Sequence, residues 1–188
     1  LKGSTIDFDP VSVTATENVL MAASLAEGKT IINNAAKEPE VVDLADCLNK
    51  MGAMIKGQGT DRIVIRGVKT LEGCNFSVIP DRVETATYLT AVAMTGGSIK
   101  IKRTRPNSVD SILNKLREAG AVIKSGEDWV SLKMEKNRPK ATSLSTGPYP
   151  SFPTDMQAQF IALNSIARGT ATVTENVFDN RFMHVQEI

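Results

Sequence analysis

The sequence predicts an α/β protein made of repeated αβαββ units, each about 70 residues long. Three recurring features support this prediction: a capped helix start, a glycine after the helix, and a short strand after the glycine. The helix starts have a capping residue followed three positions later by Glu or Gln, which satisfies first-turn N–H groups. These pairs are Thr14 with Glu17, Asp81 with Glu84, and Thr154 with Gln157.

The first helix of each unit carries a mostly apolar run, which predicts burial on nearly all sides. The runs cover residues 19–23, 88–94 and 160–163. Each ends at a glycine, a residue that adopts the left-handed cap conformation at little cost. These glycines are Gly28, Gly97 and Gly169, and the strands predicted after them cover residues 30–32, 98–102 and 171–174.

The first two units continue with a second helix and a hairpin. Leucines and other apolar residues at three-and-four spacing predict helices around residues 44–51 and 109–116, closed by Gly52 and Gly120. Pairs of short strands with glycine-containing turns follow, at residues 53–56 with 62–66 and 121–124 with 129–132. The third unit ends after its first strand. Residues 78–80, between the first two units, fit either an interdomain crossing or a simple loop.

Composition limits the function classes. The chain has 188 residues, 41% hydrophobic and 23% charged, with a formal net charge of +1. These values fit a soluble globular protein and give no sign of nucleic-acid or membrane partners. Two cysteines make no disulfide framework, so we expect a cytoplasmic protein, and a single histidine argues against a His-based metal site.

Two segments are candidates for chemistry. The loop at residues 147–155 has three prolines, and it presents Asp155 at a helix start on a stiff support. Asp155 is either a capping carboxylate or a general base. The segment at residues 9–14 places hydroxyls at another helix N-terminus, which suits either plain capping or an anion such as phosphate.

Other reactive or polar residues have plainer interpretations. Residues 175–182 mix charges with two aromatics, and they either line a polar cleft or cover a sheet edge. Cys47 is predicted to be a buried small apolar residue on a helix, and Cys74 has no evident activator.

Four strings closely resemble the bacterial UDP-N-acetylglucosamine 1-carboxyvinyltransferases, the enolpyruvyl transferases that begin peptidoglycan precursor synthesis. They are PYPSFPTDMQAQF (148–160), ENVFDNRFMHVQEI (175–188), NNAAKEPEVVDLA (33–45) and GTDRIVIRGV (59–68). The resemblance runs over essentially the whole chain. It implies an inside-out α/β barrel fold with two similar domains, of which this chain is an internal part. Residues 1–79 then resemble the last αβαββ unit of one domain, and residues 80–188 the first and part of the second unit of the other.

The resemblance also implies site residues. Asp155 matches the aspartate that acts on the 3-hydroxyl of the sugar during transfer from phosphoenolpyruvate. Val177 matches a position whose backbone contacts the sugar nucleotide, with Phe178 beside it. The segment that binds the nucleotide part corresponds to Pro10, Val11, Ser12 and Val13. No cofactor or metal is implied, and both partners are small-molecule substrates.

The chain departs from the family pattern in two places and lacks one part of it. Some members have Lys where this chain has Pro10, and relatives often have Gly near Thr14 or Ala15. The family's Lys–Asn pair for phosphoenolpyruvate and its loop cysteine lie upstream of Leu1, so we expect this chain alone to be inactive. Two alternatives stay open: the sister enzyme that acts on shikimate 3-phosphate, and a non-catalytic repeat scaffold.

Overall fold

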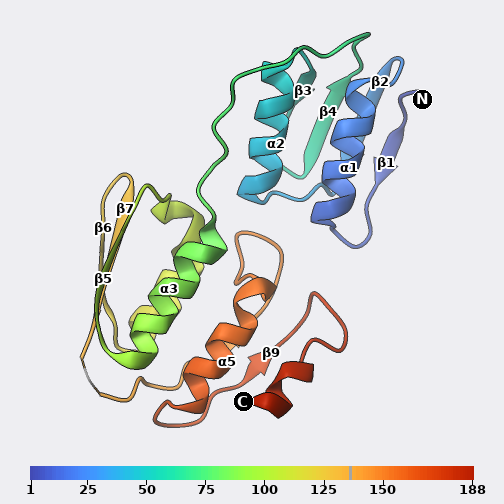
Figure 1. The fold of residues 1–188 in the computed structure, drawn as a ribbon. Helices are drawn as coiled ribbons and strands as arrows, with labels where there is room; N and C mark the ends of the chain where they lie inside the picture. Colours follow the sequence, from blue (N-terminus) through green and yellow to red (C-terminus); the bar gives the residue numbers. More distant parts are fainter. Residues whose placement is uncertain (136) are drawn as a thin grey trace. The chain divides into compact units, whose positions relative to one another are not determined.

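The computed structural model describes residues 1–135 and 137–188, which form a mixed α/β structure (Figure 1). The chain divides into two compact units, Leu1–Ile79 and Pro80–Ile188. Each unit has its own apolar core, because the helices of each pack against a sheet of the same unit.

The first unit is a four-stranded sheet with two helices on one face (Figure 1). The strand order is β1-β2-β4-β3, where β1 is parallel to β2 and the other neighbours are antiparallel. Its strands are β1 (Thr5–Asp7), β2 (Lys29–Asn33), β3 (Met54–Lys56) and β4 (Arg62–Arg66), and its helices are α1 (Val13–Ser24) and α2 (Pro39–Lys50).

Alternation along the strands builds the core of this unit. Ile32 pairs with Ile63, and Thr30 pairs with Ile65, so these side chains share one face of the sheet. All four are buried, and they pack beneath helix residues such as Leu20.

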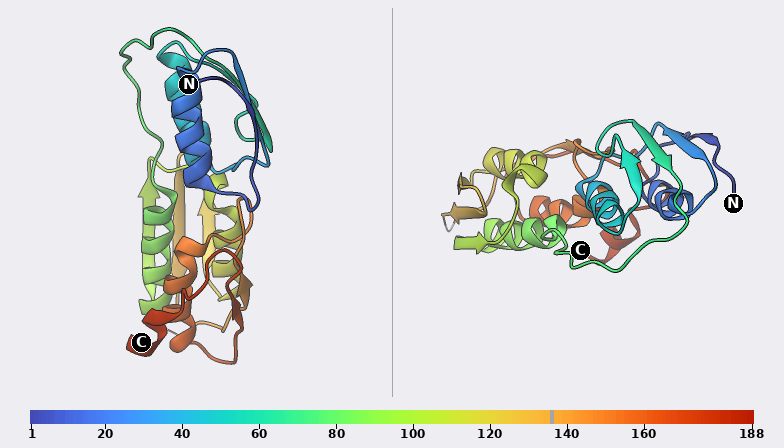
Figure 2. Two further views of the ribbon diagram at one scale, coloured as in Figure 1. Left: turned by 90° about the vertical axis from the view of Figure 1, so that its right-hand side faces the viewer. Right: turned by 90° about the horizontal axis from the view of Figure 1, so that it is seen from above.

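The second unit contains two sheets. A three-stranded antiparallel sheet has the order β5-β7-β6, and a shorter parallel pair joins β8 to β9. Helices α3 and α5 lie side by side (Figures 1 and 2). The elements are α3 (Arg82–Thr95), β5 (Gly97–Lys102), α4 (Asp110–Glu118), β6 (Val122–Ser125), β7 (Trp129–Met134), β8 (Leu144–Ser145), α5 (Gln157–Ser165) and β9 (Val173–Thr174), with 3-10 turns at Pro106–Val109, Thr154–Met156 and Met183–Glu187.

The predicted repeat is confirmed. The order α1-β2-α2-β3-β4 recurs as α3-β5-α4-β6-β7, and the third, partial αβαββ repeat consists of α5 and β9. Strands β1 and β8 were not predicted. Each precedes the first helix of an αβαββ repeat, β1 before α1 and β8 before α5, and pairs in parallel with the strand after that helix.

The predicted caps agree with the structure only in part. Asp81 caps α3, accepting hydrogen bonds from the backbone N–H groups of Val83 and Glu84. The prediction for Thr154 is wrong, because its hydroxyl donates to Glu175 and a 3-10 turn precedes α5 instead of a side-chain cap.

The predicted burial of the first helices on nearly all sides is also wrong for α1 and α3. Met21 on α1 is 45% exposed and Tyr88 on α3 is 56% exposed, whereas Leu20 and Leu89 are fully buried. Within this chain, α1 contacts α2 and β4, and α3 contacts α5, β5 and β7, and these contacts leave Met21 and Tyr88 at the surface. Among the described residues, none of the helices has the length and apolar character needed to span a membrane.

Candidate active site

Two loops that the sequence singles out occupy equivalent places in the two units. One joins β1 to α1 and the other joins β8 to the 3-10 turn before α5. Each loop leaves the carboxyl end of the first strand of a parallel pair. Ligands bind preferentially at such strand ends in parallel α/β arrangements.

An asparagine ties each loop to the second strand of its pair. Asn34 follows β2, and its side-chain amide donates to the carbonyl of Phe8 at 2.8 Å. Asn176 follows β9, and its amide donates to the carbonyl of Thr146 at 2.9 Å. Both loops are therefore fixed at their beginning by the same kind of contact.

In the first unit, the β1–α1 loop ends in a capped helix start. Ser12 has extended backbone angles (φ −139°, ψ 122°), and its hydroxyl oxygen accepts a hydrogen bond from the N–H of Ala15 at 3.2 Å. The predicted cap at Thr14 is therefore wrong, because the helix begins earlier, at Val13. The N–H groups that open α1 lie at the positive end of the helix dipole, which favours an anion.

In the second unit, buried neighbours hold Asp155 at the surface. Phe152, Pro153 and Met156 are buried, and the Phe152 ring meets the Phe160 ring edge-on at 4.9 Å. Asp155 lies between them on the 3-10 turn Thr154–Met156, with its side chain 56% exposed. A carboxylate on this support is accessible to a ligand, while its backbone is fixed by the core.

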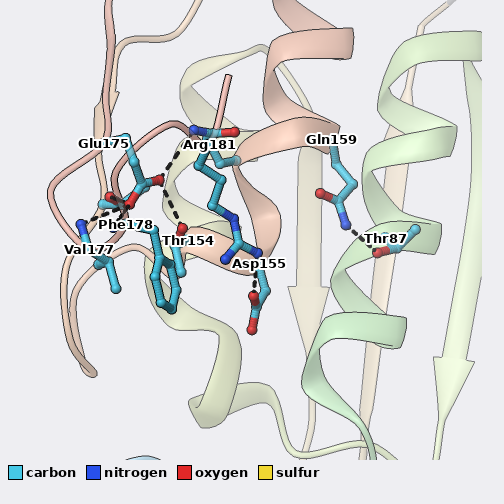
Figure 3. Close-up of polar contacts among 10 residues, drawn as sticks. Thr87, Thr154, Asp155, Gln159, Glu175, Val177, Phe178 and Arg181 are labelled. Carbon is cyan, nitrogen blue, oxygen red and sulfur yellow. Dashed lines mark hydrogen bonds and ion pairs between the residues drawn. The ribbon is translucent and has the colours of Figure 1, made fainter. Parts of the chain in front are cut away.

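Arg181 is the partner of Asp155 (Figure 3). One guanidinium nitrogen of Arg181 lies 2.8 Å from Oδ1 of Asp155 and donates to it. The guanidinium also lies over the Phe178 ring, 4.9 Å from its centroid. The ion pair places a proton acceptor directly beside a cation whose flat, multiply donating group suits carboxylates and phosphates.

Val177 and Phe178 lie in the turn after β9, and these residues are 39% and 53% exposed. Both backbone N–H groups donate to Oε1 of Glu175, at 2.8 Å and 3.2 Å (Figure 3). The Val177 N–H is thus used within the protein, so a ligand would meet its carbonyl or side chain.

The Glu175 carboxylate is half-buried and strongly hydrogen-bonded. Burial by itself raises the pKa of this group, but hydrogen bonds from the Val177 N–H, the Thr154 and Thr146 hydroxyls and the Phe178 N–H together lower it below its ordinary value. Glu175 is therefore ionised at neutral pH.

The structure brings together only some of the predicted site residues. Asp155, Val177 and Phe178 come together in the unit Pro80–Ile188. Pro10, Val11, Ser12 and Val13 form a separate cluster in the unit Leu1–Ile79. Within the described ranges 1–135 and 137–188, there is no group of three or more His, Cys, Asp or Glu residues that could hold a metal ion.

Sequence reasoning missed Arg181 and Glu175 as site residues. Both belong to the segment 175–182, for which it offered a cleft lining or a sheet cover. The only available signal was the presence of both charge signs in a segment following a strand. The contacts that matter join residues 26 and 21 positions apart.

A protein-family model described as EPSP synthase (3-phosphoshikimate 1-carboxyvinyltransferase) matches residues 1–188. The chain therefore belongs to this family of enolpyruvyl transferases. Its fold is similar to that of the enolpyruvyl transferase NikO from Streptomyces tendae, with a TM-score of 0.85 and 22% identity over 100% of this chain and 47% of that one. It is also similar to EPSP synthase from Acinetobacter baumannii, with a TM-score of 0.59 and 20% identity over 92% of this chain and 41% of that one. The chain thus spans less than half the length of either protein, and the predicted fold class is confirmed.

Proposed function

We propose that this chain is part of an enzyme that transfers the enolpyruvyl group of phosphoenolpyruvate to the 3-hydroxyl of UDP-N-acetylglucosamine, releasing phosphate. Family membership supports the reaction class. The observation that carries the proposal is the exposed Asp155 carboxylate, 2.8 Å from Arg181 at the end of a proline-rich loop. The choice of acceptor rests on the resemblance of residues 148–160 and 175–188 to the sugar-nucleotide enzymes.

The reaction is an addition followed by an elimination. Asp155 accepts the proton of the sugar 3-hydroxyl while the sugar oxygen bonds to C2 of phosphoenolpyruvate. The C2–C3 double bond opens, and C3 takes up a proton from water. The product is a tetrahedral intermediate that still carries the phosphate. C3 then loses a proton to water, the double bond re-forms, and the phosphate leaves with the electron pair of the bond to C2 and takes up a proton from water. Asp155 returns its proton to water. A positioned base is worth about 10²–10⁴ in rate, and Arg181 supplies positive charge beside two anionic substrates.

The remaining predicted residues bind substrate in this proposal. The N–H groups at Ser12 and Val13 meet the diphosphate at the start of α1, and Pro10 and Val11 contact the nucleotide part. Val177 and Phe178 contact the sugar. We assign residues 1–79 to the last αβαββ unit of one barrel domain, and residues 80–188 to the first unit and part of the second unit of the other.

A second candidate is 3-phosphoshikimate 1-carboxyvinyltransferase. It is favoured by the description of the matching family model and by the Acinetobacter baumannii structure. The chemistry at Asp155 would be the same, with a different acceptor hydroxyl. Only the acceptor distinguishes the two candidates.

Competition binding to the longer protein that contains this chain separates them. Labelled UDP-N-acetylglucosamine and labelled shikimate 3-phosphate are each offered to the protein, and any bound label is challenged with an excess of either unlabelled compound. We expect only UDP-N-acetylglucosamine to bind, and only its unlabelled form to displace it. Selective binding of shikimate 3-phosphate would support the second candidate, and binding of neither would contradict both.

One backbone group in the first unit can be tested separately. Val13 is the first residue of α1, a position where proline is favoured, and the extended Ser12 before it tolerates a following proline. Val13→Pro therefore removes one N–H from the proposed diphosphate site while keeping the helix. We expect weaker UDP-N-acetylglucosamine binding than in the control Val13→Ala. Equal affinity of the two variants would remove this N–H from the site.

A further inference from the structure

We propose that Glu175 is a positioning residue, whose carboxylate holds the loop that carries Asp155 against the turn that leads to Arg181. The inference rests on the proposed function, because it concerns how the proposed base and its cationic partner are held. Glu175 follows β9 directly, and among the described residues it forms no hydrogen bond or ion pair with Asp155 or Arg181.

The two oxygens of Glu175 divide their contacts between different segments (Figure 3). Oε1 accepts from the N–H groups of Val177 and Phe178 at 2.8 Å and 3.2 Å, and from the Thr146 hydroxyl at 2.9 Å. Oε2 accepts from the Thr154 hydroxyl at 2.8 Å and from the Gln157 amide at 3.2 Å. One side chain thus joins the end of β8, the 3-10 turn, the start of α5 and the turn after β9.

The residues that Glu175 holds are adjacent to both members of the ion pair. Thr154 directly precedes Asp155 in the chain. Phe178 lies under the Arg181 guanidinium, 4.9 Å from it, so its backbone position affects where that guanidinium rests. Asp155 is 56% exposed and has little packing of its own, so its place depends on these backbone contacts.

The positions of Asp155 and Arg181 therefore depend on the hydrogen bonds of one carboxylate. Hydrogen bonds to a charged acceptor are about twice as strong as neutral ones, and five of them converge on this half-buried group. A displacement of about 1 Å of a reacting group can cost about 100-fold in rate. Losing the carboxylate frees both sides of the ion pair to shift by such amounts.

Three substitutions in the longer protein distinguish geometry from charge. Glu175→Ala removes every contact, and Glu175→Asp keeps the charge but shortens the side chain. Glu175→Gln keeps the length, and its new amide group finds an acceptor. Among the described residues, Oε1 of Gln157 is buried without a hydrogen-bond partner, and it can face the new amide after an amide rotation. We expect kcat to fall about 100-fold in Glu175→Ala, less in Glu175→Asp, and least in Glu175→Gln, with KM changing by less than about threefold.

Asn164→Ala is the matched structural control. Asn164 joins the C-terminal end of α5 to the segment that leads into β8, through two hydrogen bonds with the backbone of Thr142, at 2.9 Å and 3.0 Å. Its loss destabilises the same unit at a distance from Asp155. We expect kcat to stay within about twofold of the unsubstituted protein.

A double-mutant cycle with Asp155→Asn gives the decisive result. If Glu175 acts through Asp155, then Glu175→Ala adds almost nothing to the loss already caused by Asp155→Asn. Additive losses, or an equal loss of kcat in Asn164→Ala, would overturn the positioning role. If Glu175→Ala does not fold, Glu175→Asp takes its place in the cycle. The positioning role is then overturned if the kcat of Glu175→Gln is equal to or below the kcat of Glu175→Asp. If the unsubstituted protein transfers the enolpyruvyl group to shikimate 3-phosphate instead, the proposed acceptor is wrong, while the same cycle measured with that acceptor still supports or overturns the positioning role.

Discussion

Replacing Asp155 with Asn should remove activity while leaving the fold nearly unchanged. The structure allows both sides of this prediction to be estimated. Asp155 and Arg181 form a single ion pair with side chains that are 56% and 36% exposed. Such surface pairs contribute about 0–1 kcal/mol, so the free energy of unfolding should fall by less than about 1 kcal/mol. The loss of a positioned base should lower kcat by about 10²–10⁴.

The assay measures phosphate release from phosphoenolpyruvate and UDP-N-acetylglucosamine by the longer protein, together with urea denaturation. Asp110→Asn is the control, because Asp110 is also an exposed aspartate in the first turn of a helix in the same unit. We expect full activity in the control. If Asp155→Asn keeps its activity, the carboxylate is not the base. If function is also independent of phosphoenolpyruvate, the scaffold alternative is favoured.

Three further predictions concern stability and proximity. Ser12→Ala should lower the free energy of unfolding of the first unit by about 1 kcal/mol and Thr14→Ala by less than about 0.5 kcal/mol in urea denaturation, because only Ser12 caps α1; equal losses would argue against this cap. Diamide should join Cys47 to Cys74 as a disulfide detectable by peptide mass spectrometry, because both thiols are half-buried and burial together with the neighbouring Cys74 thiol raises the pKa of Cys47; pairing only between molecules would contradict their placement. The folded-state pKa of Glu175 lies below the ordinary value of 4.5, so the stabilisation it provides is present above that value and lost as pH falls through the folded pKa. Denaturation midpoints at about pH 6 and about pH 3.5 should therefore differ more in the unsubstituted protein than in Glu175→Gln, and the same difference in both would refute this contribution.

The repeated elements could be predicted from sequence because their signals are local. The glycines after the helices have positive φ, 94° at Gly28 and 102° at Gly169, and apolar spacing marks the helices before them. Strands β1 and β8 could not be predicted in the same way. They have three and two residues, too few for alternation to be visible, and each exists because a distant parallel strand pairs with it.

The cap of α1 shows a limit of motif reading. Thr14 with Glu17 matches the capping pattern, but Ser12 takes the extended conformation that a cap requires. Which of two neighbouring hydroxyl residues caps a helix depends on where the preceding loop leaves the chain. Here that loop is fixed by Asn34, a contact with no local sequence signal.

The candidate site was predictable only in its most local part. Three prolines around Asp155 indicated a stiff support, and the structure supplies its physical basis in the buried Phe152, Pro153 and Met156. The pairing with Arg181 depends on how the segment after β9 folds back towards the β8–α5 loop. Cys47 was expected to be buried, but it is half-buried, and its pKa is raised by burial and by the neighbouring Cys74 thiol, which again comes from a segment distant in sequence.

Analysis of the product tests most directly whether the enolpyruvyl group is transferred to the amino sugar. The longer protein is incubated with phosphoenolpyruvate labelled with carbon-13 at C2 and with UDP-N-acetylglucosamine, and the product is examined by NMR. The proposed function predicts one phosphate released for each labelled enol ether formed at the sugar's 3-oxygen. A labelled ether that forms only when shikimate 3-phosphate is the acceptor would contradict it.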